Sequence, residues 1–347
     1  MRRSLLLGLS LLALGCDNTD PGPEDDAGGG VDAGHDAPDP FDAGGTVESF
    51  TVTFGPVTVA PAEENTQCVI VRLGNPAMLR VGRIHNVLSP GSHHFIVYRT
   101  NDTEERATPF DCQPFVETLN PEAGSPLMIT QRSDETLTLP DGVAFSLDPN
   151  QMVRLEMHYI NTGTTSLDVT GTATFTSVPD ELFEYEADFL FIGTPDIDLA
   201  PRVATTVGPA YFPIPADLAD VNFFGITGHT HRFGTNVEVM TTDSEAGAGN
   251  MVYSVDDWRW DEPDTVRHDP AFNIPAGGGF RFQCDYQNTS DANVGFGESA
   301  NEEMCFFWAY YYPSQGSRVC VHTEQAGGVD VCCPGNPTLC DLISRMF

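Results

Sequence analysis

Short runs of alternating apolar and polar residues follow one another from residue 49 onward. Successive side chains of an extended strand point to opposite faces, so a period of two indicates strands with one buried face. Gly, Pro, Asn and Asp bound the runs, and no helical period extends beyond three turns, so the pattern predicts an all-β fold of antiparallel strands. The clearest segments are 50–54, 68–72, 95–98, 153–158, 167–175, 222–226, 235–239, 279–284 and 305–312.

A break in this pattern at Val178, Pro179 and Asp180 divides the strand-rich part of the chain in two. A length of 347 residues gives about two domains as a prior, and 40% hydrophobic residues suffice for a core in each. We therefore expect two tandem antiparallel β-sandwich domains, at 48–179 and 180–347.

Residues 1–16 are typical of an export signal, because two arginines precede an apolar run that is too short to span a membrane. The run ends at Gly15-Cys16 and resembles a bacterial lipoprotein box, although Leu14 stands where that box prefers a small residue. The resemblance implies cleavage before Cys16, a lipid on its thiol and a place in the bacterial cell envelope. Plain secretion is the alternative.

Residues 17–47 contain nine acidic residues and no basic one, and Asp, Gly, Ala and Pro dominate. Such a segment cannot form a core, so we expect a disordered acidic tether, with membrane contact only through the lipid anchor. The whole chain has a formal net charge of -34, and all 16 of its basic residues are Arg. This charge excludes a nucleic-acid partner bound through a basic groove, and the lack of Lys excludes lysine-based catalysis.

Eight of the nine cysteines remain after Cys16 is set aside. An even number in an exported protein indicates up to four disulfides, whereas metal binding is less favoured because no CxxC pair is present. Adjacent cysteines rarely bond to each other, so Cys332 and Cys333 are expected to have separate partners. The eight are Cys68, Cys112, Cys284, Cys305, Cys320, Cys332, Cys333 and Cys340.

Five of the nine histidines fall into three short motifs: the pair His93-His94, the single His158, and His229 with His231. Strand residues i and i+2 project to one face about 7 Å apart, so His229 and His231 can converge on one metal. Adjacent strand residues face opposite sides, so His93 and His94 can share an ion only at a bulge or strand end. The Pro-Gly step just before them supplies such an irregularity. Structural polar histidines are the alternative.

Imidazole suits zinc, copper, iron and nickel, whereas a thioether ligand selects copper. The segment 297–305, GESANEEMC, is followed by an aromatic strand that ends in three tyrosines. It resembles the methionine-ligand segment of the type II, ascorbate-dependent copper monooxygenases, the family of peptidylglycine α-hydroxylating monooxygenase and dopamine β-monooxygenase. That family's signature is an HH pair, a lone His, an HTH triplet and a Met beside a Cys, and all four occur here in that order within roughly 65–325.

The resemblance implies two jelly-roll-like β-sandwiches that face each other across a solvent-filled cleft, with two coppers per chain. His93, His94 and His158 would bind the electron-supplying copper of the first domain. The oxygen-activating copper of the second domain would be bound by His229, His231 and Met304, which are the expected catalytic residues. The resemblance also implies a disulfide between Cys284 and Cys305, with Cys68–Cys112 as a second pair.

The implied activity is hydroxylation of a C–H bond of a small organic substrate by O2, with ascorbate or an equivalent reductant. The peptidylglycine branch holds its substrate carboxylate with an Arg, an Asn and a Tyr. At the matching positions this chain has Thr227, Phe306 and Trp308, which departs from that branch and points to a more apolar substrate. Burial of the two aromatic residues in the sandwich core is the alternative. The oligomeric state stays open.

Two other functions are compatible with these motifs. A non-enzymatic exported copper-binding protein for capture or delivery could use the same ligands, and O2 consumption with a reductant distinguishes it from an enzyme. A zinc hydrolase or structural zinc protein is less favoured, because no acid stands at a suitable spacing from the HTH triplet. A serine hydrolase is excluded by the lack of a GxSxG motif.

Overall fold

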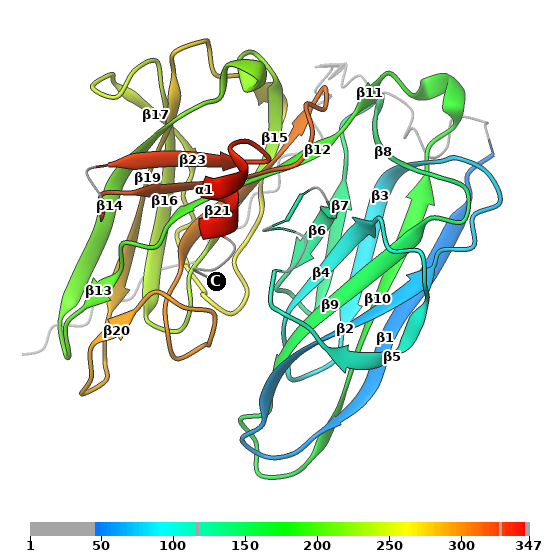
Figure 1. The fold of residues 1–347 in the computed structure, drawn as a ribbon, viewed down its shortest axis with the longest axis horizontal. Helices are drawn as coiled ribbons and strands as arrows, with labels where there is room; N and C mark the ends of the chain where they lie inside the picture. The colour runs from blue at the N-terminus through cyan, green and yellow to red at the C-terminus, as the bar shows by residue number, and fades with distance from the viewer. Residues whose placement is uncertain (1–45, 116–117, 119, 122, 326–327, 344–347) are drawn as a thin grey trace, which may run out of the picture. The chain divides into compact units, whose positions relative to one another are not determined.

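The computed structural model describes residues 46–115, 118, 120–121, 123–325 and 328–343 (Figure 1). The predicted signal peptide, the lipidation site at Cys16 and nearly all of the predicted tether at 17–47 lie outside the described residues. All described residues belong to one compact unit of the chain.

The strands up to residue 186 form two sheets, as the alternating pattern of this half predicts (Figure 1). One sheet has the order β1-β10-β3-β8-β11, with β7 also paired to β3, and the other has the order β5-β2-β9-β4-β6. The strands are β1 (Ser49–Val59), β2 (Glu64–Arg72), β3 (Leu79–Leu88), β4 (Ser92–Thr100), β5 (Arg106–Asp111), β6 (Gly124–Thr130), β7 (Asp134–Thr138), β8 (Val143–Leu147), β9 (Met152–Ile160), β10 (Leu167–Ser177) and β11 (Tyr185–Glu186).

The later strands form a second pair of sheets and a short ladder of β13 with β20. The sheet orders are β18-β15-β21-β12-β22-β23 and β14-β19-β16-β17. The strands are β12 (Asp188–Thr194), β13 (Asp198–Leu199), β14 (Ala204–Pro213), β15 (Asn222–His229), β16 (Gly234–Thr242), β17 (Gly249–Tyr253), β18 (Val266–Phe272), β19 (Gly279–Gln287), β20 (Val294–Gly295), β21 (Cys305–Tyr312), β22 (Arg318–Thr323) and β23 (Val329–Cys333).

The named helical elements of the described chain are short. They are two 3-10 turns, η1 (Asp180–Leu182) and η2 (Ala216–Leu218), and the helix α1 (Pro337–Ile343). No helix among the described residues has the length and apolar character needed to cross a membrane. The predicted all-β fold with antiparallel sheets of the sandwich type is confirmed.

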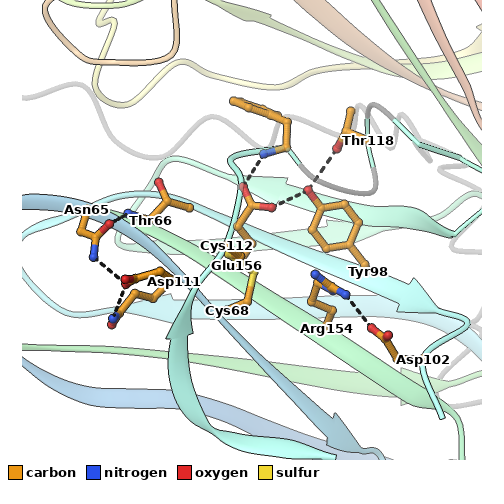
Figure 2. Close-up of a disulfide and its surroundings, with 12 residues drawn as sticks. Asn65, Thr66, Cys68, Tyr98, Asp102, Asp111, Cys112, Thr118, Arg154 and Glu156 are labelled. Carbon is orange, nitrogen blue, oxygen red and sulfur yellow. Dashed lines mark hydrogen bonds and ion pairs between the residues drawn. A yellow bond between two sulfur atoms is a disulfide. The ribbon is translucent and has the colours of Figure 1, made fainter. Parts of the chain in front are cut away.

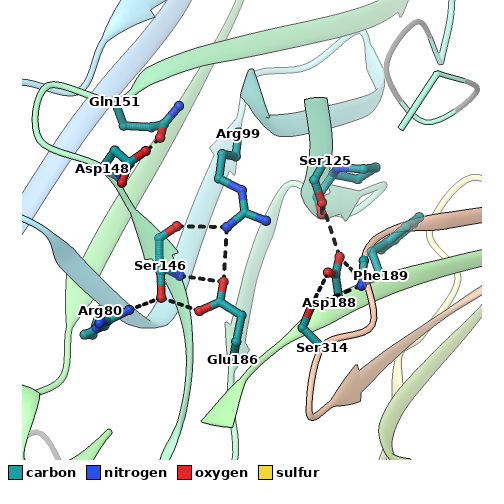
Figure 3. Close-up of polar contacts among 12 residues, drawn as sticks. Arg80, Arg99, Ser125, Ser146, Asp148, Gln151, Glu186, Asp188, Phe189 and Ser314 are labelled. Carbon is teal, nitrogen blue, oxygen red and sulfur yellow. Dashed lines mark hydrogen bonds and ion pairs between the residues drawn. The ribbon is translucent and has the colours of Figure 1, made fainter. Parts of the chain in front are cut away.

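The sheets of the first half give way to those of the second between Glu186 and Asp188 (Figure 3). The Glu186 carboxylate accepts hydrogen bonds from Arg99 and from the Ser146 backbone N–H, so it fastens β11 to the first half. The buried Asp188 accepts a hydrogen bond of 2.6 Å from the Ser314 hydroxyl of the second half. Its pKa is raised by burial, which the Ser314 hydrogen bond partly opposes. The expected boundary at Pro179 thus precedes this change of sheets by several residues.

Strand β21 separates two groups of core residues, because its side chains alternate between its two faces. Phe307, Ala309 and Tyr311 belong to a cluster formed entirely by residues of the second half. The other face belongs to a cluster that contains most of the first half's core; its members on and next to β21 are Met304, Phe306, Trp308 and Tyr310. One face of β21 is therefore part of the core that the two halves share.

Candidate metal centre

His93 and His94 lie at the start of β4, where the pairing with β9 is irregular. Ser92 pairs with Tyr159 and His94 with His158, so the register shifts by one residue at His93. A bulge of this kind suspends the alternation of faces, which allows neighbouring side chains to converge. The ring centroids of His93 and His94 are 5.5 Å apart, and those of His158 are 5.1 Å from His93 and 4.9 Å from His94.

These spacings suit a shared metal ion. A ring nitrogen about 2.0 Å from a metal places the ring centroid roughly 3 Å from it, so two ligand rings lie roughly 4.5–5.5 Å apart. All three rings of this first histidine group, His93, His94 and His158, fall in that range.

The second histidine group, His229 and His231, lies where β15 ends. Its two rings are 5.2 Å apart and nearly perpendicular, at 88°. The last pair of the β15–β21 ladder joins His229 to Phe306, and the same antiparallel count, continued for two residues, puts Met304 opposite His231. Met304 is fully buried on the face of β21 that joins the core shared by both halves.

The two histidine groups are close to each other, although they come from different halves of the chain. The rings of His93 and His231 are 6.0 Å apart. The ring of Phe115 lies 4.9 Å from His94 and 6.0 Å from His229. Side chains of both halves are therefore in contact at this place, where the family resemblance implied a solvent-filled cleft.

Four of the five histidines are held in the neutral form by burial, which penalises the imidazolium ion. Burial lowers the pKa of His93 to about 3 and that of His231 to about 4. It also holds the pKa values of His94 and His229 well below the ordinary range. Neutral imidazole is the form that binds a metal, so these side chains need not lose a proton to act as ligands.

Several ring nitrogens are buried without a hydrogen-bond partner among the described residues. They are Nδ1 and Nε2 of His93, Nδ1 of His94 and Nε2 of His229. A buried polar atom without a partner costs about 1–3 kcal/mol. These unpaired nitrogens come from both histidine groups, and metal ions bound to them would explain why they are buried without a hydrogen bond.

One ring nitrogen of each of His158, His229 and His231 is hydrogen-bonded to another residue of the protein. His158 donates Nε2–H to the Glu64 carboxylate over 3.0 Å, and this hydrogen bond lowers the Glu64 pKa to about 2. His229 pairs through Nδ1 with Gln131 Oε1 at 2.9 Å, and His231 Nδ1–H donates to the Glu302 carbonyl at 3.0 Å. Such partners orient ligand rings, so His158 would ligate through Nδ1 and the other two through Nε2.

The segment before β21 is fastened to the end of β15 by Glu303, which is completely buried. Its carboxylate accepts the backbone N–H of His231 at 2.8 Å and that of Phe233 at 2.7 Å. Ala300, in the same segment, donates its N–H to Glu64 at 3.2 Å, so Glu64 contacts both halves. Glu303 therefore fixes His231 relative to the neighbouring Met304.

Phe115, the residue between the two histidine groups, is held by the buried Glu156, which Figure 2 labels. The Glu156 carboxylate accepts the Phe115 backbone N–H at 2.7 Å and the Tyr98 hydroxyl at 2.9 Å. Phe115 has a φ of 52°, a left-handed conformation that such a residue adopts only when its surroundings impose it. Figure 2 also shows the disulfide Cys68–Cys112 beside this network.

Thr227, Phe306 and Trp308, the positions expected to line a substrate pocket, are all buried. Phe306 stacks on another core ring, and Trp308 lies 6.1 Å from the ring of His229. The Thr227 hydroxyl is 2.8 Å from that of Thr265. Thr265 in turn lines a cavity of about 260 Å³, so Thr227 is one residue removed from this space.

The disulfides account for all eight cysteines of the described chain. The structure forms Cys68–Cys112 and Cys284–Cys305. The four cysteines whose pairing the sequence left open form Cys320–Cys332 and Cys333–Cys340, so the adjacent pair has separate partners. Four disulfides are typical of an exported protein.

Removal of the Cys284–Cys305 bond by a double alanine variant is expected to lower the free energy of unfolding by about 3 kcal/mol, because the bond closes a 21-residue loop. It is also expected to weaken metal binding by the candidate ligand Met304, which precedes Cys305. Urea unfolding and a copper titration measure the two effects. Removal of Cys333–Cys340, near the end of the chain, is the control. Equal copper affinity in both variants would contradict the second effect.

The described His, Cys, Asp and Glu side chains do not form a completed metal centre of three or more ligands. The donor types, the neutral state of the rings and the unpaired nitrogens nevertheless suit a metal such as copper. Glu64, Gln131 and Glu303 were not predicted from the sequence. Each is remote in sequence from the histidine that it contacts, so no local motif marks it.

Comparison with protein families gives a match at residues 210–329 to the C-terminal domain of copper type II ascorbate-dependent monooxygenases. Among curated proteins no match was found. Among solved structures, the major capsid protein P2 of bacteriophage PM2 is similar with a TM-score of 0.36 and 9% identity, covering 78% of this chain and 100% of that chain. PNGase F, a glycosylasparaginase from Flavobacterium meningosepticum, has a TM-score of 0.30 and 10% identity, with 82% and 99% covered.

Proposed function

We propose that this protein is a copper-dependent monooxygenase, because residues 210–329 match the C-terminal domain of the copper type II ascorbate-dependent monooxygenases. It hydroxylates a C–H bond of a small organic substrate with O2 and an external reductant such as ascorbate. The observation that carries the proposal is the set of five buried histidines with unpaired nitrogens in both groups, of which His229 and His231 lie within the matched residues.

The first histidine group would hold one copper and the second group, with Met304, another. His93, His94 and His158 offer three imidazoles and no thioether. His229 and His231 offer two imidazoles, and Met304 adds a soft sulfur that favours the reduced state of copper. When bound, the two coppers supply the electrons and the oxygen-binding position that the reaction requires.

The remaining residues position these ligands and keep water away from them. Glu64 and Gln131 hold His158 and His229 by the ring nitrogen that does not ligate. Phe115 fills the space between the two groups with an aromatic ring. Burial of both groups excludes water, which protects a reactive site from side reactions.

The substrate is proposed to enter next to Thr227, through the cavity that Thr265 lines. Met128, Leu137 and Phe224 give this cavity an apolar part, and charged residues such as Glu135 and Arg267 line the rest of it, so a substrate with an apolar and a polar portion would fit. The protein is proposed to be an exported lipoprotein of the bacterial cell envelope, anchored through Cys16. The four disulfides support export.

Metal analysis of the purified chain tests the proposal, with about two coppers per chain as the expected result. O2 uptake that depends on both copper and reductant, and that increases with a suitable organic substrate, is the second expected result. Zinc as the sole bound metal would refute a copper protein. Two bound coppers without reductant-dependent O2 uptake would instead favour a role in copper capture or delivery.

A further inference from the structure

Gln131 follows β6 in the first half of the chain and is 5% exposed. Its two amide atoms both contact the second half. Oε1 lies 2.9 Å from Nδ1 of His229, and Nε2 lies 3.4 Å from the backbone carbonyl of Trp260. Gln131 is thus a side chain of the first half that hydrogen-bonds to a histidine of the second group.

The contact with Trp260 decides which way the amide points. A backbone carbonyl can only accept a hydrogen bond, so the Gln131 NH2 must face Trp260 and its oxygen must face His229. An amide oxygen can only accept, so Nδ1 of His229 must carry the proton. The Gln131 amide therefore selects the His229 tautomer that leaves Nε2 with a free lone pair.

That lone pair is the buried nitrogen of His229 without a partner among the described residues. If the proton moved to Nε2, the ring would offer no donor pair there to a metal. The segment that Gln131 holds also reaches the first group, since the Trp260 ring lies 5.3 Å from that of His93. One amide therefore contacts His229 directly and approaches His93 through Trp260.

We propose that Gln131 is a positioning residue that sets the metal-binding tautomer of His229 from across the contact between the two halves. The inference rests on the proposed function, because it presumes that His229 is a copper ligand. It makes the affinity of the second site depend on a residue of the first half, which the family resemblance does not indicate.

Three variants of the full-length mature protein test this role. Gln131→Leu keeps a similar volume and removes both hydrogen bonds. Gln131→Glu keeps an oxygen that accepts from His229 Nδ1–H but cannot donate to Trp260. Gln283→Leu is the matched control, because Gln283 on β19 makes its side-chain hydrogen bond to Glu238 on β16 and not to a histidine.

Copper(I) affinity is measured by competition with a chromophoric chelator, and X-ray absorption identifies the copper that has a sulfur ligand. In Gln131→Leu we expect a 10- to 100-fold loss of affinity at the sulfur-ligated copper only, the usual effect of losing an outer partner of a metal-bound histidine. Gln131→Glu is expected to bind both coppers as the parent does, and so is Gln283→Leu. Rescue by glutamate separates positioning of His229 from general packing.

Unchanged copper affinity in Gln131→Leu would overturn this inference while two coppers in the parent uphold the proposed function. An equal loss in Gln131→Glu would also overturn it, because the acceptor would then not matter. A parent that binds no copper would overturn both. If Gln131→Leu does not fold, Gln131→Asn withdraws the amide by one methylene, and the same selective loss is expected.

Discussion

Met304→Ile is expected to reduce reductant-dependent O2 uptake by at least ~100-fold, beyond the usual cost of losing only an outer partner of a metal ligand. Met304 is fully buried in the shared core just before β21, and the β15–β21 register, continued for two residues beyond its last pair, puts it opposite His231. Isoleucine keeps apolar bulk, so the expected loss of stability is less than about 1.5 kcal/mol. The change removes only the soft sulfur that we propose as a copper ligand.

One copper per chain is expected to remain in Met304→Ile, because His93, His94 and His158 are unchanged. Copper stoichiometry and O2 uptake, measured on variant and parent together, provide the test. Met152→Ile is the matched control, since Met152 is a buried methionine on β9 that does not line the proposed substrate cavity. If Met304→Ile consumed O2 like the parent, Met304 would be a core residue and the second copper site as proposed would be wrong.

Glu303→Ala is expected to lower the free energy of unfolding by about 4 kcal/mol. The Glu303 carboxylate accepts the backbone N–H groups of His231 and Phe233, and it is completely buried. Alanine leaves two buried donors without an acceptor, and each costs about 1–3 kcal/mol. The same change frees the end of β15 from the segment that precedes β21, so copper at His231 and Met304 should bind more weakly.

Glu302→Ala is the natural control for this variant. The neighbouring Glu302 is exposed, and its side chain makes one long hydrogen bond of 3.4 Å to Ser299. We expect the free energy of unfolding of Glu302→Ala to stay within about 0.5 kcal/mol of the parent value. For Glu303→Gln we expect a loss of free energy of unfolding that lies between those of the two alanine variants. Urea unfolding measures all three. Equal stability of the two alanine variants would show that Glu303 does not fasten this segment.

The residues that hydrogen-bond to the candidate ligands could not be predicted from the sequence. His229 and Gln131 are 98 residues apart, and His231 and Glu303 are 72 apart. Glutamine and glutamate are common at strand ends and in turns, so neither residue stands out in the sequence. The pairing of β15 with β21 brings Glu303 to His231, and contact between the two halves brings Gln131 to His229.

The irregular start of β4 was predicted in part from the sequence and decided in part by the pairing of strands. The Pro-Gly step before His93 indicated that a bulge was available, and the register shift between Ser92 and His94 occurs there. The sequence could not tell that His158 would stand opposite His94, because register depends on which strand is the neighbour.

By itself the sequence determined the all-β fold, because the period of two in its apolar residues is a local property of each strand. It also determined the candidate ligand set, because the HH, HTH and Met-Cys motifs are local as well. The tertiary structure decided that β21 turns Met304 toward the shared core and that the two histidine groups come within 6.0 Å of each other. Those features depend on contacts between residues remote in sequence, which the packing of the two halves alone creates.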